Sequence, residues 1–136
     1  MKTLIVEDDF LTRSLLSTLL SEYGICHVTA DGDQALAAVT QAYAEHSPYD
    51  LICLDIAMPG RDGQQTLDDI RKVEELHGVS GLEACTVIMI TALDDSENIM
   101  RAFHQGKCEA YLTKPLDREK LFSLLRELGL VGEQKI

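Results

Sequence analysis

The sequence predicts an α/β protein in which a five-stranded, all-parallel sheet is covered by helices on both faces. Three observations predict this doubly wound architecture. Five short apolar runs alternate with five longer amphipathic stretches, the runs are unbroken as in strands that are buried on both sides, and turn residues such as Gly32, Pro48 and Gly63 lie between them. Such alternation favours right-handed crossovers between parallel strands. The 136 residues suffice for one domain with its own core.

The five apolar runs are the predicted strands, and they cover residues 3–6, 25–30, 50–55, 86–91 and 110–113. The run Val87-Ile88-Met89-Ile90 is apolar on both faces, which is typical of a strand inside such a sheet. In open sheets of this class, ligands bind beyond the carboxyl ends of the strands, where the strand order reverses. We therefore expect the functional residues to follow these runs directly.

The five amphipathic stretches are the predicted helices. The first has a stripe of leucines that we expect to face the core, and Gly24 follows it where a left-handed helix cap is expected. Asp94 or Asp95 is expected to cap the fourth helix, which runs to about residue 105, and Gly129 is expected to end the fifth. The leucine stripe consists of Leu11, Leu15, Leu16, Leu19 and Leu20.

The chain is strongly acidic, because 12 lysine and arginine residues against 23 aspartate and glutamate residues give a net charge of −11. Nucleic-acid binding needs cations that neutralise phosphates, and anionic membranes repel an acidic chain. We therefore expect no nucleic-acid and no membrane partner. The sequence has no targeting segment and no run near the roughly 20 apolar residues of a spanning helix. Its four scattered cysteines are expected to be reduced thiols, which together indicates a cytoplasmic protein.

Acidic side chains concentrate at the predicted strand ends. Glu7 and Asp8 follow the first strand, and Asp55 ends the third. Two carboxylates about 4 Å apart repel by roughly 4 kcal/mol at an effective dielectric of 20, so either some hold a proton or a cation joins them. Mg²⁺ suits such a site. Thr91 and Lys114 end or follow the next two strands and offer a hydroxyl and a positive charge to a phosphoryl group, which indicates phosphoryl transfer to a carboxylate.

Four segments resemble the receiver domain of bacterial two-component response regulators. They lie in order at the ends of the first, third, fourth and fifth predicted strands, and the resemblance extends from residue 2 to about residue 129. It implies the flavodoxin-like or CheY-like (βα)5 arrangement with strand order 2-1-3-4-5, and a single domain over residues 1–136 with a short tail over residues 130–136. The segments are Val6-Glu7-Asp8-Asp9, Leu54-Asp55-Ile56-Ala57-Met58-Pro59-Gly60, Ile90-Thr91-Ala92 and Tyr111-Leu112-Thr113-Lys114-Pro115.

The resemblance implies a role for each matching residue. Asp55 is the implied phosphoacceptor, and Thr91 and Lys114 would hold the oxygens of the phosphoryl group. Asp8 would bind Mg²⁺ directly and Glu7 through water. The same site is expected to accept Mn²⁺ in place of Mg²⁺.

The same resemblance implies the rest of the metal site and a switch. Asp55 itself and the backbone carbonyl of Ala57 would complete the ligands. Tyr111 would change rotamer when Thr91 moves toward the phosphate. Pro115 matches a peptide bond that is typically cis in the family and helps to aim the preceding lysine.

Some positions depart from the family's pattern. Ala57 and Leu93 stand two residues beyond the phosphoacceptor and the threonine, where the family often has polar side chains that help to place the attacking water. Neither side chain can form a hydrogen bond, so we expect slow loss of phosphate. Asp9 is expected to cap a helix rather than to bind metal. Residues 77–85 form a longer connection than usual, for which a tolerated surface insertion is favoured over a partner contact.

The implied function is signalling. A sensor histidine kinase or a histidine phosphotransfer protein would phosphorylate Asp55, and the surface made by the fourth helix, fifth strand and fifth helix would then change shape. Because the sequence ends shortly after the last predicted helix, we expect control of an unknown target protein in trans. Two alternatives stay open: a phosphorelay intermediate that passes its phosphate to a histidine phosphotransfer protein, and a receiver excised from a larger regulator or hybrid kinase. The resemblance also leaves room for a homodimer through that surface.

Other classes fit the residues less well. An aspartate-nucleophile phosphatase needs a second acid where Ala57 stands, and a flavin binder needs a phosphate loop where acids follow the first strand. A scaffold that has lost its chemistry would lack one of the site residues. The protein is therefore expected not to be an enzyme, beyond catalysing its own phosphorylation and slow autodephosphorylation.

Overall fold

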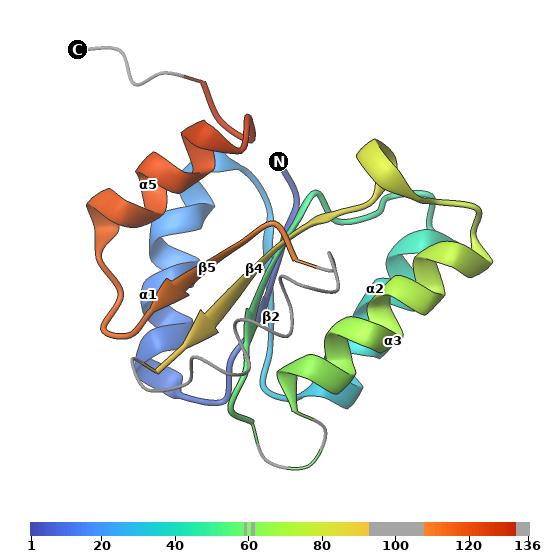
Figure 1. Ribbon diagram of the computed structural model, residues 1–136, viewed down its shortest axis with the longest axis horizontal. Helices are drawn as coiled ribbons and strands as arrows, with labels where there is room; N and C mark the ends of the chain where they lie inside the picture. The colour runs from blue at the N-terminus through green and yellow to red at the C-terminus, as the bar shows by residue number, and fades with distance from the viewer. Residues whose placement is uncertain (59, 61, 93–107, 133–136) are drawn as a thin grey trace.

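The structure is a computed structural model of the chain, and it describes all residues except 59, 61, 93–107 and 133–136 (Figure 1). The expected fourth helix, its cap at Asp94 or Asp95, and Leu93 lie outside the described residues. The strands are β1 (Thr3–Val6), β2 (Cys26–Thr29), β3 (Leu51–Asp55), β4 (Thr86–Thr91) and β5 (Ala110–Thr113).

All five strands pair in parallel in one sheet, in the order β2-β1-β3-β4-β5. This confirms the predicted fold class and strand order. Because all strands run the same way, the ends of β1, β3, β4 and β5 meet at one edge of the sheet.

Helices cover both faces of the sheet. In Figure 1, α1 and α5 lie on one side and α2 and α3 on the other. Each pair closes its own apolar core, because successive strand residues point to opposite faces: Ile5 packs with α1 and α5, whereas Leu4 and Val6 pack with α2 and α3. The helices are α1 (Phe10–Leu20), α2 (Gly32–Ala44), α3 (Gly63–Leu76) and α5 (Arg118–Glu127), with short 3-10 helices η1 (Ser21–Tyr23) and η2 (Gly81–Glu83).

Aspartates cap the amino ends of the four described α-helices. Each side chain accepts hydrogen bonds from backbone N–H groups in the first turn, which would otherwise lack partners. Four acidic residues of this acidic chain are therefore structural. The capping residues are Asp9, Asp31, Asp62 and Asp117.

The expectation for the first leucine stripe is partly wrong. Leu16, Leu19 and Leu20 are buried, but Leu11 is 75% and Leu15 43% exposed. The helix rests on the sheet along a narrower strip than the stripe, so its outer edge carries uncovered leucines.

The two predicted glycine caps have different outcomes. Gly129 has φ +72° and follows α5 as expected. Gly24 follows η1 with φ +143° and ψ −161°, which is not the left-handed helical conformation. It is required for another reason, because a Cβ there would clash with the backbone oxygen of Met1.

The four cysteines are free thiols, as expected. Cys53, Cys85 and Cys108 are buried, whereas Cys26 on β2 is partly exposed. Burial raises the pKa of the Cys53 and Cys85 thiols to about 12. Of the helices in the described part of the chain, none combines the length and apolar character that crossing a membrane requires.

Candidate functional site

Three carboxylates gather at the carboxyl edge of the sheet. Asp55 is the last residue of β3, and Glu7 and Asp8 directly follow the neighbouring strand β1, in which Val6 pairs with Leu54. One oxygen from each carboxylate lies within 4.8 Å of the others. Glu7 is fully buried and Asp55 is 2% exposed, whereas Asp8 is exposed.

Lys114, which directly follows the edge strand β5, contacts two of these carboxylates. Its Nζ donates to Glu7 Oε1 at 3.1 Å and lies 3.5 Å from Asp55 Oδ2. Its backbone N–H donates to Thr91 O at 2.7 Å, which fixes the chain where it leaves β5. One ammonium group therefore neutralises part of the charge on two buried acids.

The environment of Asp55 favours its neutral form. Burial raises the pKa of its carboxyl group to about 7, the charge and hydrogen bonding of Glu7 add to this, and the Lys114 ammonium opposes it. Burial by itself lowers the pKa of Lys114, but the hydrogen bond to Glu7 and the charge of Asp55 outweigh burial and raise it. The raised pKa favours a proton on Asp55, and the Lys114 ammonium adds positive charge beside Glu7 and Asp55.

The oxygen set fits a hard divalent cation. Glu7 Oε2 and Asp55 Oδ2 are buried and have no hydrogen-bond partner among the described residues. The other oxygen of Asp55 accepts from the backbone N–H of Ala57 at 3.2 Å. Because buried carboxylate oxygens without donors are costly, Mg²⁺, which prefers such ligands, would relieve this site.

Backbone contacts fix the segment that follows β1. The Arg13 guanidinium donates to Glu7 O at 2.9 Å, and the Asp9 N–H donates to Glu7 Oε1 at 3.1 Å. The Asp9 carboxylate accepts from the N–H and the hydroxyl of Thr12, which confirms that Asp9 caps α1. Glu7 is thus oriented by its own main chain and by α1.

A residue that sequence reasoning missed holds the loop after Asp55. Gly63, the first residue of α3, donates its N–H to Ile56 O at 2.9 Å. A Cβ at Gly63 would clash with the backbone oxygen of Asp55, so only glycine fits this approach. A glycine that directly follows a capping aspartate was visible in the sequence, but its neighbour across the loop was not.

The remaining predicted residues lie around the same edge. Thr91 ends β4, directly after the residue that pairs with Asp55, and it is 1% exposed with its hydroxyl donating to Ala92 O at 3.1 Å. Tyr111 lies on β5 opposite Met89 and is 43% exposed. The Lys114-Pro115 peptide bond is cis.

A parallel sheet with order 2-1-3-4-5, with three carboxylates and a lysine at its carboxyl edge, defines a CheY-like doubly wound domain with an acidic pocket. Residues 3–126 match the family described as the response regulator receiver domain. The chain belongs to this family, which confirms the resemblance found in the sequence.

Relatives with curated descriptions include several histidine kinases. The chain is 28% identical over 137 residues to histidine kinase CKI1 of Arabidopsis thaliana, covering 93% of this chain and 12% of that protein. It is 32% identical over 132 residues to hybrid signal transduction histidine kinase M of Dictyostelium discoideum, covering 96% of this chain and 5% of that kinase. The chain therefore spans only a small part of these relatives.

Solved structures agree with this family. The receiver domain of CKI1 from Arabidopsis thaliana, complexed with Mg²⁺ and BeF₃⁻, has a TM-score of 0.78 at 28% identity, covering 96% of this chain and 90% of that chain. The same domain complexed with Mg²⁺ has a TM-score of 0.77 at 29% identity, covering 93% and 90%. The chemotaxis protein CheY4 of Vibrio cholerae, at 24% identity and a TM-score of 0.73 with 93% and 96% covered, shares the fold.

Proposed function

We propose that Asp55 accepts a phosphoryl group from a phosphohistidine in a two-component phosphorelay, with Mg²⁺ as cofactor. The observation that carries this proposal is the nearly buried Asp55 carboxylate with its Oδ2 facing the Lys114 ammonium at 3.5 Å. Receiver family membership and the acidic cluster of Glu7, Asp8 and Asp55 support it.

In the transfer step, a carboxylate oxygen of Asp55 attacks phosphorus and forms a P–O bond. The P–N bond to the donor imidazole breaks, and the imidazole keeps the electron pair and takes a proton from solvent. Lys114 can contact a phosphoryl oxygen from its place beside Asp55, and Thr91 approaches from the end of β4.

Magnesium would be held by Asp8, Asp55 and the backbone carbonyl of Ala57, with Glu7 acting through water. When bound, it supplies positive charge that brings the carboxylates and the phosphoryl oxygens together. Two buried carboxylate oxygens without hydrogen-bond partners in the described part of the chain support this assignment. Mn²⁺ has the same oxygen preference and is expected to substitute.

The phosphorylated state would act through Thr91 and Tyr111. Contact of the Thr91 hydroxyl with a phosphoryl oxygen draws the end of β4 toward Asp55, and the half-exposed ring of Tyr111 on the adjacent strand can then turn inward. The surface around β5 and α5 changes shape, and a target protein or a second copy of the chain would bind there.

The donor would dock on α1. The exposed Leu11 and Leu15 line a groove of about 200 Å³ together with Lys114, Pro115 and Leu116. An apolar helix face of the donor that lies in this groove would bring its phosphohistidine next to the Lys114 ammonium.

A relay role inside a hybrid kinase is the second candidate. The relatives named above are histidine kinases, two of the matched proteins from Dictyostelium discoideum being hybrid kinases by name, and the chain spans 12% of CKI1 and 5% of kinase M. In that role phospho-Asp55 would return its phosphate to a histidine phosphotransfer protein instead of changing the affinity for a target.

Acetyl phosphate with Mg²⁺, followed by intact-mass measurement, tests the proposal. The wild type is expected to gain one phosphate and Asp55→Ala none. Equal gains in both proteins would refute Asp55 as the acceptor. Incubation of the phosphorylated wild type with a histidine phosphotransfer protein then separates the two candidate roles, since only a relay receiver returns its phosphate.

A further inference from the structure

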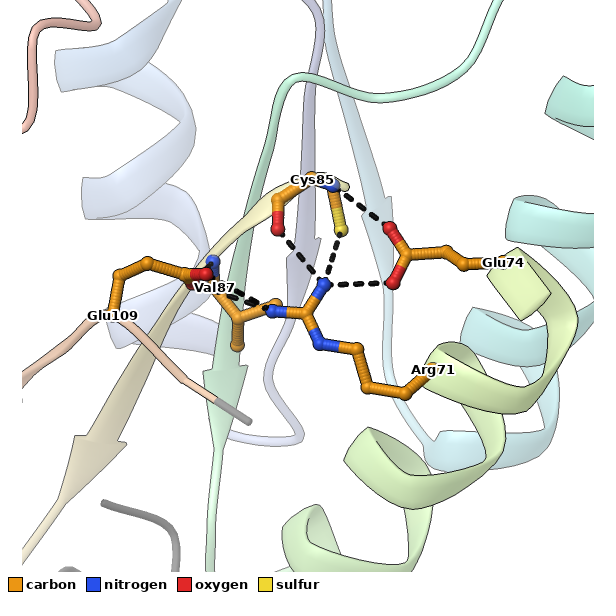
Figure 2. Close-up of polar contacts among 5 residues, drawn as sticks. All are labelled: Arg71, Glu74, Cys85, Val87 and Glu109. Atoms are coloured by element: carbon orange, nitrogen blue, oxygen red, sulfur yellow. Dashed lines mark hydrogen bonds and ion pairs between the residues drawn. The ribbon is translucent and has the colours of Figure 1, made fainter. Parts of the chain in front are cut away.

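A second cluster of charged side chains lies at the opposite end of the sheet, where β4 and β5 begin (Figure 2). Arg71, which projects from α3, is at its centre. Its Nη1 donates to Glu74 Oε1 at 2.7 Å and to Cys85 O at 2.9 Å, and its Nη2 donates to both oxygens of Glu109 at 3.3 Å. One guanidinium therefore connects a helix to the starts of two strands.

The connection to β4 is made twice. Glu74 Oε2 accepts from the Cys85 N–H at 2.8 Å while its other oxygen binds Arg71, and the Glu74 side chain is almost completely buried. The residue directly before β4 is thus held by α3 through both its N–H and its carbonyl group. This pair also closes the base of the long connection over residues 77–85.

The connection to β5 fixes the pairing of the two strands. The Glu109 N–H donates to Val87 O at 3.0 Å, and Glu109 Oε2 accepts from the Val87 N–H at 2.6 Å. Glu109 therefore binds both the N–H and the carbonyl oxygen of Val87. This contact lies directly before Ile88 and Ala110, the first pair of residues in the β4–β5 register. Arg71 holds the Glu109 carboxylate in the position that this contact needs.

The register of β5 decides where Lys114 lies. β5 is a four-residue strand at the sheet edge, and it ends with the bond from Lys114 N–H to Thr91 O. In a strand with alternating faces, a slip by one residue turns every side chain to the other face. The five steps along the chain from Glu109 to Lys114 span about 16 Å of extended chain, and over this distance a fixed start determines the place of the lysine.

The same helix also holds the acceptor. Gly63 at the first position of α3 binds Ile56 O beside Asp55, and Arg71 and Glu74, two and three turns later, bind the starts of β5 and β4. Helix α3 is thus a common rigid frame for the carboxylate that is phosphorylated and for the strand that carries the lysine beside it.

We propose that Arg71 and Glu109 are positioning residues, which form a register clamp that places the Lys114 ammonium beside Asp55. This inference rests on the proposed phosphoacceptor function, because Lys114 matters there for the phosphoryl oxygens. The clamp touches neither phosphate nor metal and acts only through β5.

Glu109→Ala tests the clamp, since Glu109 is 38% exposed and its loss leaves the buried Glu74 paired with Arg71. Glu109→Gln is the conservative variant, because its amide oxygen can still accept from the Val87 N–H. Val39→Ala is the control, since it truncates a buried side chain of α2 that has no part in β5. Each protein is measured for melting temperature, for Mg²⁺ affinity by calorimetry and for its rate of phosphorylation by acetyl phosphate.

We expect Glu109→Ala to slow phosphorylation at saturating Mg²⁺ by about tenfold, which is less than the roughly hundredfold cost of a 1 Å misplacement at reacting groups, and to leave Mg²⁺ affinity equal or higher. Glu109→Gln should restore most of the rate. Val39→Ala should lose as much melting temperature without losing rate. A Glu109→Ala rate equal to that of Val39→Ala would overturn the clamp.

A second readout separates this proposal from the proposed function. The ¹H–¹³Cε resonance of Lys114, assigned through Lys114→Met, reports the surroundings of the ammonium in the absence of phosphate. The clamp predicts a shifted resonance in Glu109→Ala and an unshifted one in Val39→Ala, and identical resonances in both would overturn it. If the wild type accepts no phosphate, the proposed function fails while this comparison still decides the clamp.

Discussion

Lys114 and Glu7 form an ion pair across the carboxyl edge of the sheet, with Nζ 3.1 Å from Oε1. Glu7 is fully buried, and the same ammonium lies 3.5 Å from Asp55 Oδ2. A buried carboxylate that loses its partner is strongly destabilised. Lys114 therefore supplies positive charge to two of the carboxylates that a divalent cation would also attract, and this relationship leads to the first prediction.

Lys114→Met should tighten Mg²⁺ binding, because the metal would no longer compete with an ammonium for Glu7 and Asp55. We expect a gain of about threefold to tenfold in affinity, equivalent to roughly 1 kcal/mol. Calorimetric titration at pH 8, where protons compete little, measures it. Lys72→Met removes the same charge from an exposed position on α3 and should leave the affinity unchanged. Weaker Mg²⁺ binding in Lys114→Met would contradict the competition.

The raised pKa of Asp55 predicts how stability depends on pH. Burial, with the charge of Glu7, places this pKa at about 7, against an ordinary value of 3.8. The folded state therefore binds more protons than the unfolded state between these values, and stability is lost as pH rises through that window. The Asp55→Asn side chain cannot ionise, so this variant should not lose that stability as pH rises.

Without Mg²⁺, the free energy of unfolding of Asp55→Asn relative to wild type should grow by about 2 to 4 kcal/mol from pH 4 to pH 8. Urea unfolding at a series of pH values measures this. Asp9→Asn is the contrasting variant, because hydrogen bonds from Thr12 lower the pKa of Asp9 and its contribution is lost as pH falls. A flat difference between Asp55→Asn and wild type would show that Asp55 titrates normally.

Ala57→Asn should speed the loss of phosphate from Asp55. Ala57 is exposed, and its N–H already lies 3.2 Å from Asp55 Oδ1, so an added amide would lie near the attacking water. We expect an increase of about tenfold over a slow wild-type rate, a modest share of what positioned polar groups supply. Radiolabel loss with Mg²⁺ present measures both rates. A wild-type half-life of seconds, or equal rates in both proteins, would argue against the missing polar group as the cause.

Leu11→Glu should weaken phosphotransfer from a histidine phosphotransfer protein but not from acetyl phosphate. The substitution places a charge in the apolar groove on α1 that also contains Lys114 and Pro115, and only a protein donor needs that groove. We expect a loss of about tenfold in second-order rate. Leu76→Glu is the control, since Leu76 is 85% exposed at the end of α3. Equal losses with both donors would place the defect in the reaction centre instead.

Much of the fold could be predicted because the apolar runs are short and well separated. The runs at residues 3–6, 86–91 and 110–113 are strands with these same bounds in the structure. The acidic cluster was also predictable, since parallel strands must end at one edge. The exposed Leu11 and Leu15 were not, because a stripe of leucines looks the same whether a sheet or a partner covers it.

Contacts between segments that are distant in the chain could not be predicted from the sequence. Arg71 meets Cys85 and Glu109, which lie 14 and 38 residues away, and no local pattern marks them as partners. The ion pair of Lys114 and Glu7 joins residues that are 107 positions apart. Sequence reasoning could place both at strand ends, but only the structure shows which oxygen the ammonium approaches.

The uneven burial of the four thiols makes the protein suited to site-specific labelling. A maleimide reacts with an accessible thiolate. Burial raises the pKa of all four thiols, so access decides between them, and Cys53, Cys85 and Cys108 are buried. Cys26, on the edge strand β2, is the partly exposed thiol of the four. A fluorophore could therefore be attached at Cys26 without changing the sequence. It would lie on edge strand β2, at the opposite edge of the sheet from β5, whose movement it would be used to follow.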